Sequence, residues 1–261
     1  MDNIISIQGL SVNLLRSRAG NDGILKGVSF DVPSGSILGI VGGSGSGKTT
    51  LGLAMLGLLP DVMARVGGRI IFDGADLGGY SLEQWRVLRG AGISMAFQEP
   101  MSAFDPVMTI GSQISETLLA HESITSAGAR ARMLEALRSA GINDPERVAA
   151  AYAFELSGGL RQRAMIAQAI VCRPKVLIAD EPTSSLDVTT QEKILDLFNM
   201  LRRTLRLSIV LITHDLGVVR RVADEAVVLC KGEVVESGRV DQVLRAPKAV
   251  YTRTLLEAEG L

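Results

Sequence analysis

The stretch VGGSGSGKTT, residues 41–50, fits the pattern GxxxxGK[ST], in which Gly42 and Gly47 flank a spacer and Lys48 and Thr49 close the motif. The apolar run ILGIV precedes it, and the helix-forming segment TTLGLAMLGLL follows it. Glycines here let successive backbone N–H groups point into one concavity, and the N-terminal end of the next helix adds positive potential. A strand, loop and helix in this order are the context in which the motif binds nucleotide phosphates, so we expect a nucleotide site.

Each part of this loop has a task in phosphate binding. Lys48 is placed to reach the β- and γ-phosphates, and Thr49 is placed to hold Mg²⁺. The residues expected to bind the nucleotide are Gly42, Gly43, Ser44, Gly45, Ser46, Gly47, Lys48, Thr49 and Thr50. A glycine- and serine-rich turn without a ligand is the alternative, and the flanking strand and helix argue against it.

Polar side chains come at the ends of other apolar runs, where ligands bind in open α/β sheets. Asp180 ends KVLIAD and is expected to hold magnesium, while the adjacent Glu181 can deprotonate the water that attacks the γ-phosphate. His214 follows SIVLIT and can hydrogen-bond the γ-phosphate. Gln98 follows ISMAF, and its amide can contact both the metal and the attacking water. The expected metal ligands are therefore Thr49, Gln98 and Asp180, and the expected catalytic residues are Glu181, His214 and Gln98.

A single acid, amide or histidine at a strand end is often only solvated or structural. The phosphate loop favours the catalytic interpretation for Glu181 and His214. His121 lies in a helix-forming stretch without such a neighbour, so we interpret it as structural.

The segment FELSGGLRQR, residues 154–163, places two glycines at the start of a helix-forming run. Glycine costs about 1 kcal/mol relative to alanine inside a helix, so bare backbone is needed here for another reason. A helix N-terminus with Ser157 at its cap, followed by Gly158 and Gly159, makes a second phosphate-binding surface. One phosphate loop does not need such a surface within its own chain.

Composition limits the class of protein. The chain has 261 residues, of which 47% are hydrophobic, so one large or two small domains with a sizeable core are possible. The net charge of −1 gives no basic field, and we expect no nucleic-acid partner. Cys172 and Cys230 lack CxxC spacing, which indicates a reducing compartment rather than a disulfide framework or a metal cluster.

The apolar runs contain no expected targeting or membrane segment. The N-terminal residues show no basic stretch followed by an apolar one, so no signal peptide is expected. The longest apolar run, LGLAMLGLL, is about half the length of a membrane span. We therefore expect a soluble intracellular protein that can dock on a membrane protein.

The chain alternates between strand and helix patterns. Apolar alternation in IISIQGLSV, GVSFDV, SILGIVGG and GRIIFDG predicts an N-terminal sheet. Residues 112–151 favour helices, with a stop signal at Gly141 and a start signal at Pro145. The runs KVLIAD and SIVLITHD around the helical TQEKILDLFNMLRRTL predict a βαβ unit with buried parallel strands. AVVLCKGEVVESG predicts a hairpin that turns at Lys231 and Gly232.

Five motifs stand in a fixed order along nearly the whole chain: GGSGSGKT, the glutamine of AFQEP, LSGGLRQR, LIADEP with SSLD, and ITHD. This order resembles the ATP-binding subunit of ABC transporters, and LSGGLRQR upstream of an acid-ended strand is its most specific element. The segments FQEPMSAFDP, YAFELSGGLRQR, DEPTSSLDVTTQEKIL and VYTRTLL are similar to the peptide and nickel import branch of that family. The resemblance implies ATP and Mg²⁺ as ligands and ATP hydrolysis as the activity.

The resemblance also implies the fold, an α/β P-loop NTPase that forms a single ABC ATPase domain over residues 1–261. An N-terminal antiparallel β-subdomain and a RecA-like core with a parallel sheet are expected over 1–98 and 166–261. An inserted α-helical subdomain is expected over 99–165, and it carries the segment LSGGLRQR, which is called the signature below.

In this family two ATPase subunits stack head to tail, so that each ATP lies between the phosphate loop of one chain and the signature of the other. The partner is an identical copy or a paralogue. Glu181 is then the catalytic base and His214 is the switch residue. Gln98 is the residue that couples hydrolysis to the helical insert. The residues assigned to the nucleotide across the subunit interface are Ser157, Gly158, Gly159, Gln162 and Asp187.

Further partners follow from the same resemblance. Two transmembrane permease subunits hold the chain at the cytoplasmic face of the inner membrane, and an extracellular or periplasmic solute-binding protein acts indirectly. A short helix of the permease is expected in a groove near Met101, Phe104 and Met108. The expected function is to energise the import of nickel, metal chelates or small peptides, and a non-transport soluble ABC ATPase is the alternative.

Three departures from the family pattern bear on the ligand and the cargo. No aromatic residue that could stack on adenine occurs in 14–27, and Phe30, which alternates with Val28 and Val32, is expected to face the core. No cysteine follows Cys230, and the short C-terminal segment is more similar to nickel or metallophore members. SSLD lacks the usual alanine before its leucine, a change expected to be neutral.

Overall fold

The computed structural model describes residues 2–15 and 23–260, which form two compact units. The first unit combines Met1–Trp85 with Ser208–Leu261, and the second unit is Arg86–Leu207. The chain therefore leaves the first unit and returns to it. Residues 99–165, the predicted helical insert, fall inside the second unit.

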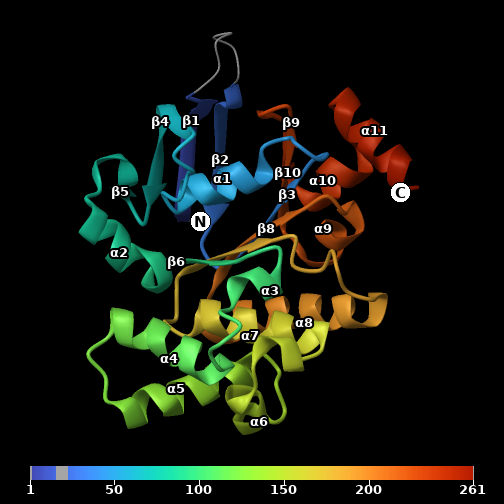
Figure 1. Cartoon of the computed structure of the whole chain (residues 1–261). Helices are drawn as coiled ribbons and strands as arrows, with labels where there is room; N and C mark the ends of the chain where they lie inside the picture. The colour runs from blue at the N-terminus through green and yellow to red at the C-terminus, as the bar shows by residue number, and fades with distance from the viewer. Residues whose placement is uncertain (1, 16–22, 261) are drawn as a thin grey trace. The chain divides into compact units, whose positions relative to one another are not determined.

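An antiparallel sheet forms the N-terminal part of the first unit. The strands are β1 (Asn3–Leu14), β2 (Gly23–Pro33), β4 (Met63–Phe72) and β5 (Ala75–Asp76), in the order β2-β1-β4-β5. β1 pairs with both β2 and β4 (Figure 1). Val28, Phe30 and Val32 lie on the buried side of β2, so the predicted core position of Phe30 is confirmed. The predicted antiparallel sheet is confirmed as well.

Mainly parallel strands form the rest of the sheet structure in this unit. They are β3 (Ile37–Val41), β8 (Ser208–Thr213), β9 (Glu225–Cys230) and β10 (Glu233–Arg239), in the order β10-β9-β3-β8. Every residue of β3 and β8 is buried, as their continuous apolar runs predicted. The β9–β10 hairpin turns at Lys231 and Gly232, whose φ angles of 49° and 84° are typical of a tight hairpin turn.

Short helices complete the first unit. They are α1 (Lys48–Met55), α9 (Leu216–Val222), α10 (Val240–Arg245) and α11 (Val250–Glu259), together with the 3₁₀ helix η1 (Leu77–Gly79). The helix α2 (Leu82–Ala91) contains the boundary between the units. Val41, Leu216, Val228 and Leu256 belong to one buried cluster, so α9 and α11 pack against the parallel strands.

The second unit combines two parallel strands with helices. Its strands are β6 (Ile93–Ala96) and β7 (Val176–Asp180), and all of their residues are buried. Its helices are α3 (Pro100–Ala103), α4 (Ile110–His121), α5 (Ser126–Ser139), α6 (Pro145–Ala150), η2 (Ala153–Glu155), α7 (Gly158–Ile170) and α8 (Val188–Leu205). Gly141 follows α5 with a φ of 74°, and Pro145 begins α6, so the predicted stop and start signals are confirmed.

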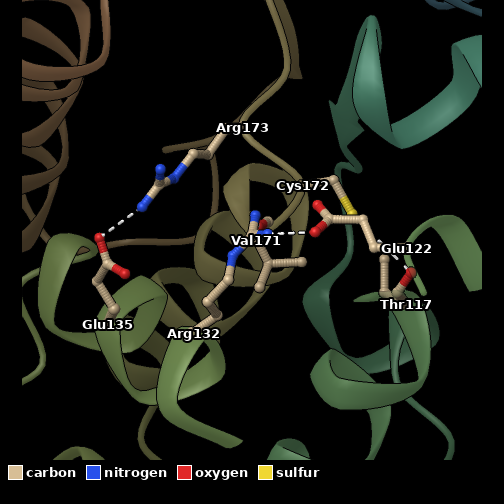
Figure 2. A network of polar contacts seen from close by, with 7 residues as sticks. All are labelled: Thr117, Glu122, Arg132, Glu135, Val171, Cys172 and Arg173. Carbon is tan, nitrogen blue, oxygen red and sulfur yellow. Dashed lines mark hydrogen bonds and ion pairs between the residues drawn. The ribbon is translucent and has the colours of Figure 1, made fainter. Parts of the chain in front are cut away.

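A polar network ties α4, α5 and the end of α7 together, as Figure 2 shows. The guanidinium of Arg132 on α5 donates to the carboxylate of Glu122, which follows α4. The same group donates to the carbonyl oxygen of Val171 at 2.9 Å. Arg173 and Glu135 form a further ion pair at 3.0 Å. Because Arg132 joins three chain segments, it stabilises the packing of the helical part of this unit.

The same network surrounds Cys172. Its Sγ lies 3.9 Å from the carbonyl oxygen of Thr117 (Figure 2). Burial, assisted by the Glu122 carboxylate and opposed by Arg132, raises the pKa of the Cys172 thiol to about 11. The thiol is therefore protonated at neutral pH and has a packing role.

No helix among residues 2–15 and 23–260 is long and apolar enough to cross a membrane.

Candidate nucleotide site

The loop between β3 and α1 requires its two motif glycines for steric reasons. A Cβ at Gly42 would lie 2.1 Å from the carbonyl oxygen of Leu229, which no side chain tolerates. Gly47 precedes α1 with a φ of 102°. A Cβ there would lie 2.8 Å from Cδ2 of Leu25. The backbone of this loop is therefore held in a shape that only glycine allows, and such loops are built to face phosphates.

Lys48 lies at the first position of α1 and is 8% exposed. Its ammonium donates to the carbonyl oxygens of Gly42 at 2.8 Å and Gly43 at 3.1 Å. The loop thus fixes a positive charge against its own backbone, at the N-terminal end of a helix. Thr49 follows it and is exposed. This arrangement suits the binding of an anionic ligand.

His214 leaves the sheet beside the phosphate loop. In the parallel pair of β3 and β8, Val41 lies opposite Thr213, so the loop and His214 follow the same end of neighbouring strands. His214 is exposed, and the next residue, Asp215, caps α9 by accepting from the N–H of Val218 at 3.0 Å. The expected juxtaposition is thus present in this unit, and the role of His214 stays a prediction.

The second unit repeats this strand-end arrangement with its acidic and amide residues. In the parallel pair of β6 and β7, Ala96 lies opposite Ala179. Gln98 and Asp180 therefore follow the same end of adjacent strands. Gln98 is exposed, whereas Asp180 is 2% exposed. Carboxylate and amide oxygens are donors that Mg²⁺ prefers, so Gln98 and Asp180 fit this metal by their chemistry, and their binding of it stays a prediction.

Glu181 has an unusual backbone conformation. Its φ of 46° lies in the left-handed region, which side-chain-bearing residues rarely adopt. The hydroxyl and the N–H of Ser184 donate to its carbonyl oxygen at 3.1 Å and 3.3 Å and hold this conformation. Backbone strain of this kind clusters at active sites, because the surrounding structure must enforce it.

The two glycines at the start of α7 differ in the space that the structure leaves for a side chain. Ser157 is the N-cap of α7, as predicted, with Oγ accepting from the N–H of Leu160 at 3.4 Å. A Cβ at Gly159 would lie 2.9 Å from Cγ2 of Thr190, so packing requires glycine there. A Cβ at Gly158 would meet only Cδ2 of Leu186, at 3.9 Å. The fold of this unit therefore does not require glycine at 158, and the phosphate-binding role of this surface stays a prediction.

Two other predicted nucleotide-binding residues are buried or take part in helix capping. Gln162 is 2% exposed and lies beneath the surface of α7. Asp187 is the N-cap of α8, and its carboxylate accepts from the N–H and the hydroxyl of Thr190 at 3.0 Å and 2.7 Å. The Thr190 hydrogen bonds lower the pKa of the Asp187 carboxyl, which keeps it ionised. Contact of either residue with nucleotide stays a prediction.

The segment after Gln98 presents both buried and exposed apolar groups. Phe104 is 4% exposed and belongs to the core, whereas Met101 is 43% exposed. The guanidinium of Arg161 on α7 lies 3.2 Å from the Sδ of Met101, which links this segment to the signature helix. The predicted groove can therefore present Met101 at its surface, but Phe104 lies below it.

One contact of the phosphate loop has no counterpart in the sequence motifs. The N–H of Gly43 donates to the hydroxyl of Tyr251 on α11, at 2.9 Å. No local pattern links these residues, which are far apart in the chain.

The predicted lack of an adenine-stacking aromatic in 14–27 falls partly on residues 16–22, which lie outside the described residues.

Comparisons with known proteins agree with this geometry. The family model described as ABC transporter matches residues 25–184. The chain is 46% identical to the peptidoglycan transport ATP-binding protein YejF of Agrobacterium fabrum over 98% of its own length, and it spans 47% of that relative. It is 43% identical to the dipeptide transport ATP-binding protein DppD of Bacillus subtilis, over 98% of this chain and 76% of that one.

Solved structures share the fold. The structure of cbiO1 from Clostridium perfringens, part of the ABC transporter complex cbiONQ, has a TM-score of 0.81 and 27% identity, covering 98% of this chain and 96% of that one. A dimeric, post-hydrolysis structure of the ATP-binding cassette MJ0796 bound to ADP and Pi has a TM-score of 0.77 and 26% identity, covering 90% and 98%. The sequence match, the phosphate loop and the shared fold lead to one conclusion: the chain belongs to the ABC transporter family.

Proposed function

We propose that the chain is the ATP-binding and ATP-hydrolysing subunit of an ABC importer that carries peptides. The observation that carries this proposal is the phosphate loop, where Gly42 and Gly47 exclude side chains and the Lys48 ammonium is fixed against the loop carbonyls. Strand-end residues in both units supply the other expected groups. The domain organisation belongs to the same proposal, with a core over 1–98 and 166–261 and a helical signature subdomain over 99–165.

Each predicted site residue has a proposed part in hydrolysis. Lys48 and the loop N–H groups bind the β- and γ-phosphates, and Glu181 accepts the proton of the attacking water. The water oxygen bonds to the γ-phosphorus, the bond to the ADP oxygen breaks, and phosphate leaves. His214 donates a hydrogen bond to the γ-phosphate and orients it. Thr49, Gln98 and Asp180 would hold magnesium, which would supply positive charge next to the phosphate oxygens.

A second ATPase subunit completes the proposed site. The bare helix start at Ser157 and Gly158 is a phosphate-binding surface that the phosphate loop of the same chain does not need. A head-to-tail pair places this surface on the partner's ATP. The dimeric cassette among the similar structures supports such a pair, and an identical copy and a paralogue both satisfy it.

The apolar surface next to Gln98 supports docking to a membrane partner. Phe97, Met101 and Val107 are 42%, 43% and 80% exposed. Contiguous exposed apolar groups are typical of an interaction surface. Two permease subunits at the inner face of the membrane are the proposed partners of this surface, and a solute-binding protein is proposed to deliver the cargo to them.

The relatives favour peptides over nickel as the cargo. Relatives are named as dipeptide, oligopeptide and peptidoglycan transport proteins. The oligopeptide transport ATP-binding protein OppD of Bacillus subtilis is 41% identical over 97% of this chain. The prediction of nickel or metallophore cargo from the short C-terminal segment is therefore not supported.

Loss of this chain is expected to reduce peptide uptake by its host to background and to leave nickel uptake unchanged. Uptake of a radiolabelled dipeptide and of radioactive nickel by a deletion strain measures both. The wild-type gene should restore uptake of the dipeptide, and a Lys48→Ala gene should not. Loss of nickel uptake alone would contradict the peptide assignment without affecting the ATPase assignment.

Lys48→Ala is expected to weaken ATP binding by roughly 10-fold to 100-fold. A hydrogen bond to a charged group contributes about 1.5–3 kcal/mol, and each 1.4 kcal/mol is about a factor of ten in affinity. Titration calorimetry with ATP and Mg²⁺ measures the dissociation constant. Lys26→Ala, which removes an exposed lysine of β2, is the matched control and should bind ATP like the wild type. Unchanged affinity in Lys48→Ala would exclude the loop as the phosphate site.

A further inference from the structure

The N-terminal end of α11 contacts the phosphate loop. The hydroxyl of Tyr251 accepts the N–H of Gly43 at 2.9 Å. A Cβ at Gly43 would lie 3.0 Å from that hydroxyl oxygen, so the two groups fit closely only because residue 43 is glycine. On its other side, the carbonyl of Gly43 accepts from the Lys48 ammonium at 3.1 Å. The peptide groups around Gly43 are therefore held by a tyrosine from α11 and by the loop's own lysine.

The other end of α11 contacts the loop that carries His214. The carboxylate of Glu259 accepts the N–H of Leu216, the first residue of α9, at 2.9 Å. Burial raises the pKa of the Glu259 carboxyl, while the Leu216 N–H lowers it. The charge of Asp215 raises this pKa and that of His214 lowers it, so both residues lie close enough to act on the carboxylate.

The helix between these two contacts is itself well anchored. Leu256 is 7% exposed and belongs to the buried cluster that contains Val41, the last residue before the phosphate loop. At the start of α11, the carboxylate of Glu236 accepts from the N–H groups of Lys248 at 2.8 Å and Ala249 at 3.1 Å. A helix fixed at its start and along its buried face can hold two loops in a constant relation.

We propose that α11 is a positioning element of the nucleotide site, with Tyr251 ordering the phosphate loop and Glu259 ordering the loop of His214. This inference rests on the proposed ATP site. Tyr251 acts on a loop that binds ATP, so it governs affinity, because ordering the loop in advance lowers the entropy lost on binding. Glu259 acts next to the residue that contacts the γ-phosphate, so it governs turnover.

Tyr251→Phe keeps the ring and removes only the hydroxyl. It is expected to raise the dissociation constant and the KM for ATP roughly twofold to tenfold, the range of a single neutral hydrogen bond, with kcat nearly unchanged. Tyr80→Phe, in the same unit, is the matched control and should change neither value. The measurement is ATP titration of the full chain, followed by steady-state ATPase assays with its partner subunits.

Glu259→Ala is expected to give the opposite pattern, a roughly twofold to tenfold lower kcat with an unchanged KM. Glu259→Gln should restore kcat, because its amide oxygen can still accept the Leu216 N–H. Glu257→Ala removes an exposed carboxylate from the same helix and should behave like the wild type. This opposite response of KM and kcat at the two ends of one helix is not expected from a general loss of stability.

Each result decides between these assignments. A wild-type chain that binds no ATP would overturn the proposed function and the inference together. If the wild type binds ATP and both variants match their controls, the inference alone is wrong. If both variants change KM and kcat to the same extent and also lower the melting temperature, α11 has only a structural role. Tighter ATP binding by Tyr251→Phe would show that the hydroxyl competes with phosphate, which also contradicts the inference.

Discussion

Glu181→Gln is expected to lower the ATPase turnover number by roughly 100-fold to 10,000-fold, the range that a general base contributes. Glutamine has nearly the same size and hydrogen-bonds like a carboxylic acid, but its amide cannot take a proton from water. ATP affinity should stay close to that of the wild type, because the phosphate loop lies elsewhere in the chain and is unchanged. A bound ATP that is not hydrolysed should therefore accumulate.

The backbone at Glu181 makes this prediction specific. Its left-handed φ of 46° is held by two hydrogen bonds from Ser184 to its carbonyl oxygen, and neither involves the carboxylate. Glutamine has to adopt the same strained conformation, so the folded structure and its melting temperature should not change. A loss of turnover can then be assigned to the missing proton acceptor rather than to misfolding.

The matched control is Glu233→Gln, which removes an exposed carboxylate at the start of β10. It should hydrolyse ATP at the wild-type rate. Single-turnover hydrolysis and a filter-binding assay with labelled ATP separate the chemical step from binding. If Glu181→Gln hydrolyses ATP at the normal rate, another group must be the base, and the strain at Glu181 must serve another purpose.

The sequence predicted best the features that depend on neighbouring residues. Gly42 and Gly47 follow from the motif spacing, and the structure adds the reason, which is the lack of room for a Cβ at either position. The β9–β10 turn and the Ser157 cap are equally local, because a turn or a helix start is set by a few consecutive residues. Parallel strands then bring His214 beside the phosphate loop, since Val41 and Thr213 lie in register.

The features that the sequence could not predict depend on which distant segments meet. Tyr251 and Gly43 form a hydrogen bond across most of the chain, and nothing near either residue indicates the partner. The burial of Gln162 depends on which face of α7 packs inward, and the motif alone does not state this. The resemblance predicts a groove near Phe104, but the side chain of Phe104 belongs to the core.

The different surroundings of the two signature glycines lead to the second large effect. Gly158→Asp is expected to lower ATP hydrolysis by at least roughly 100-fold while leaving ATP binding by the isolated chain intact. A carboxylate next to a partner's γ-phosphate adds like-charge repulsion of several kcal/mol, and each 1.4 kcal/mol is about tenfold. Within its own chain the new side chain has space, because a Cβ at 158 meets only Leu186 at 3.9 Å.

Two control variants separate this effect from a folding defect. Gly158→Ala should keep the melting temperature of the wild type, because the position is open. Gly159→Ala should lower it, because a Cβ there would lie 2.9 Å from the side chain of Thr190. A clear loss of stability in Gly158→Ala would show that glycine at 158 is structural and would remove the main argument for a partner's phosphate at this surface.

Mixing two inactive variants tests the pairing directly. A chain with Gly158→Asp keeps a normal phosphate loop, and a chain with Lys48→Ala keeps a normal signature. If two identical copies stack head to tail, a mixed pair contains one intact site, and the mixture should hydrolyse ATP although neither variant does so alone. If the partner is a paralogue, activity should return only when that paralogue is added. Normal hydrolysis by Gly158→Asp alone would contradict both arrangements, because the signature would then play no part in catalysis.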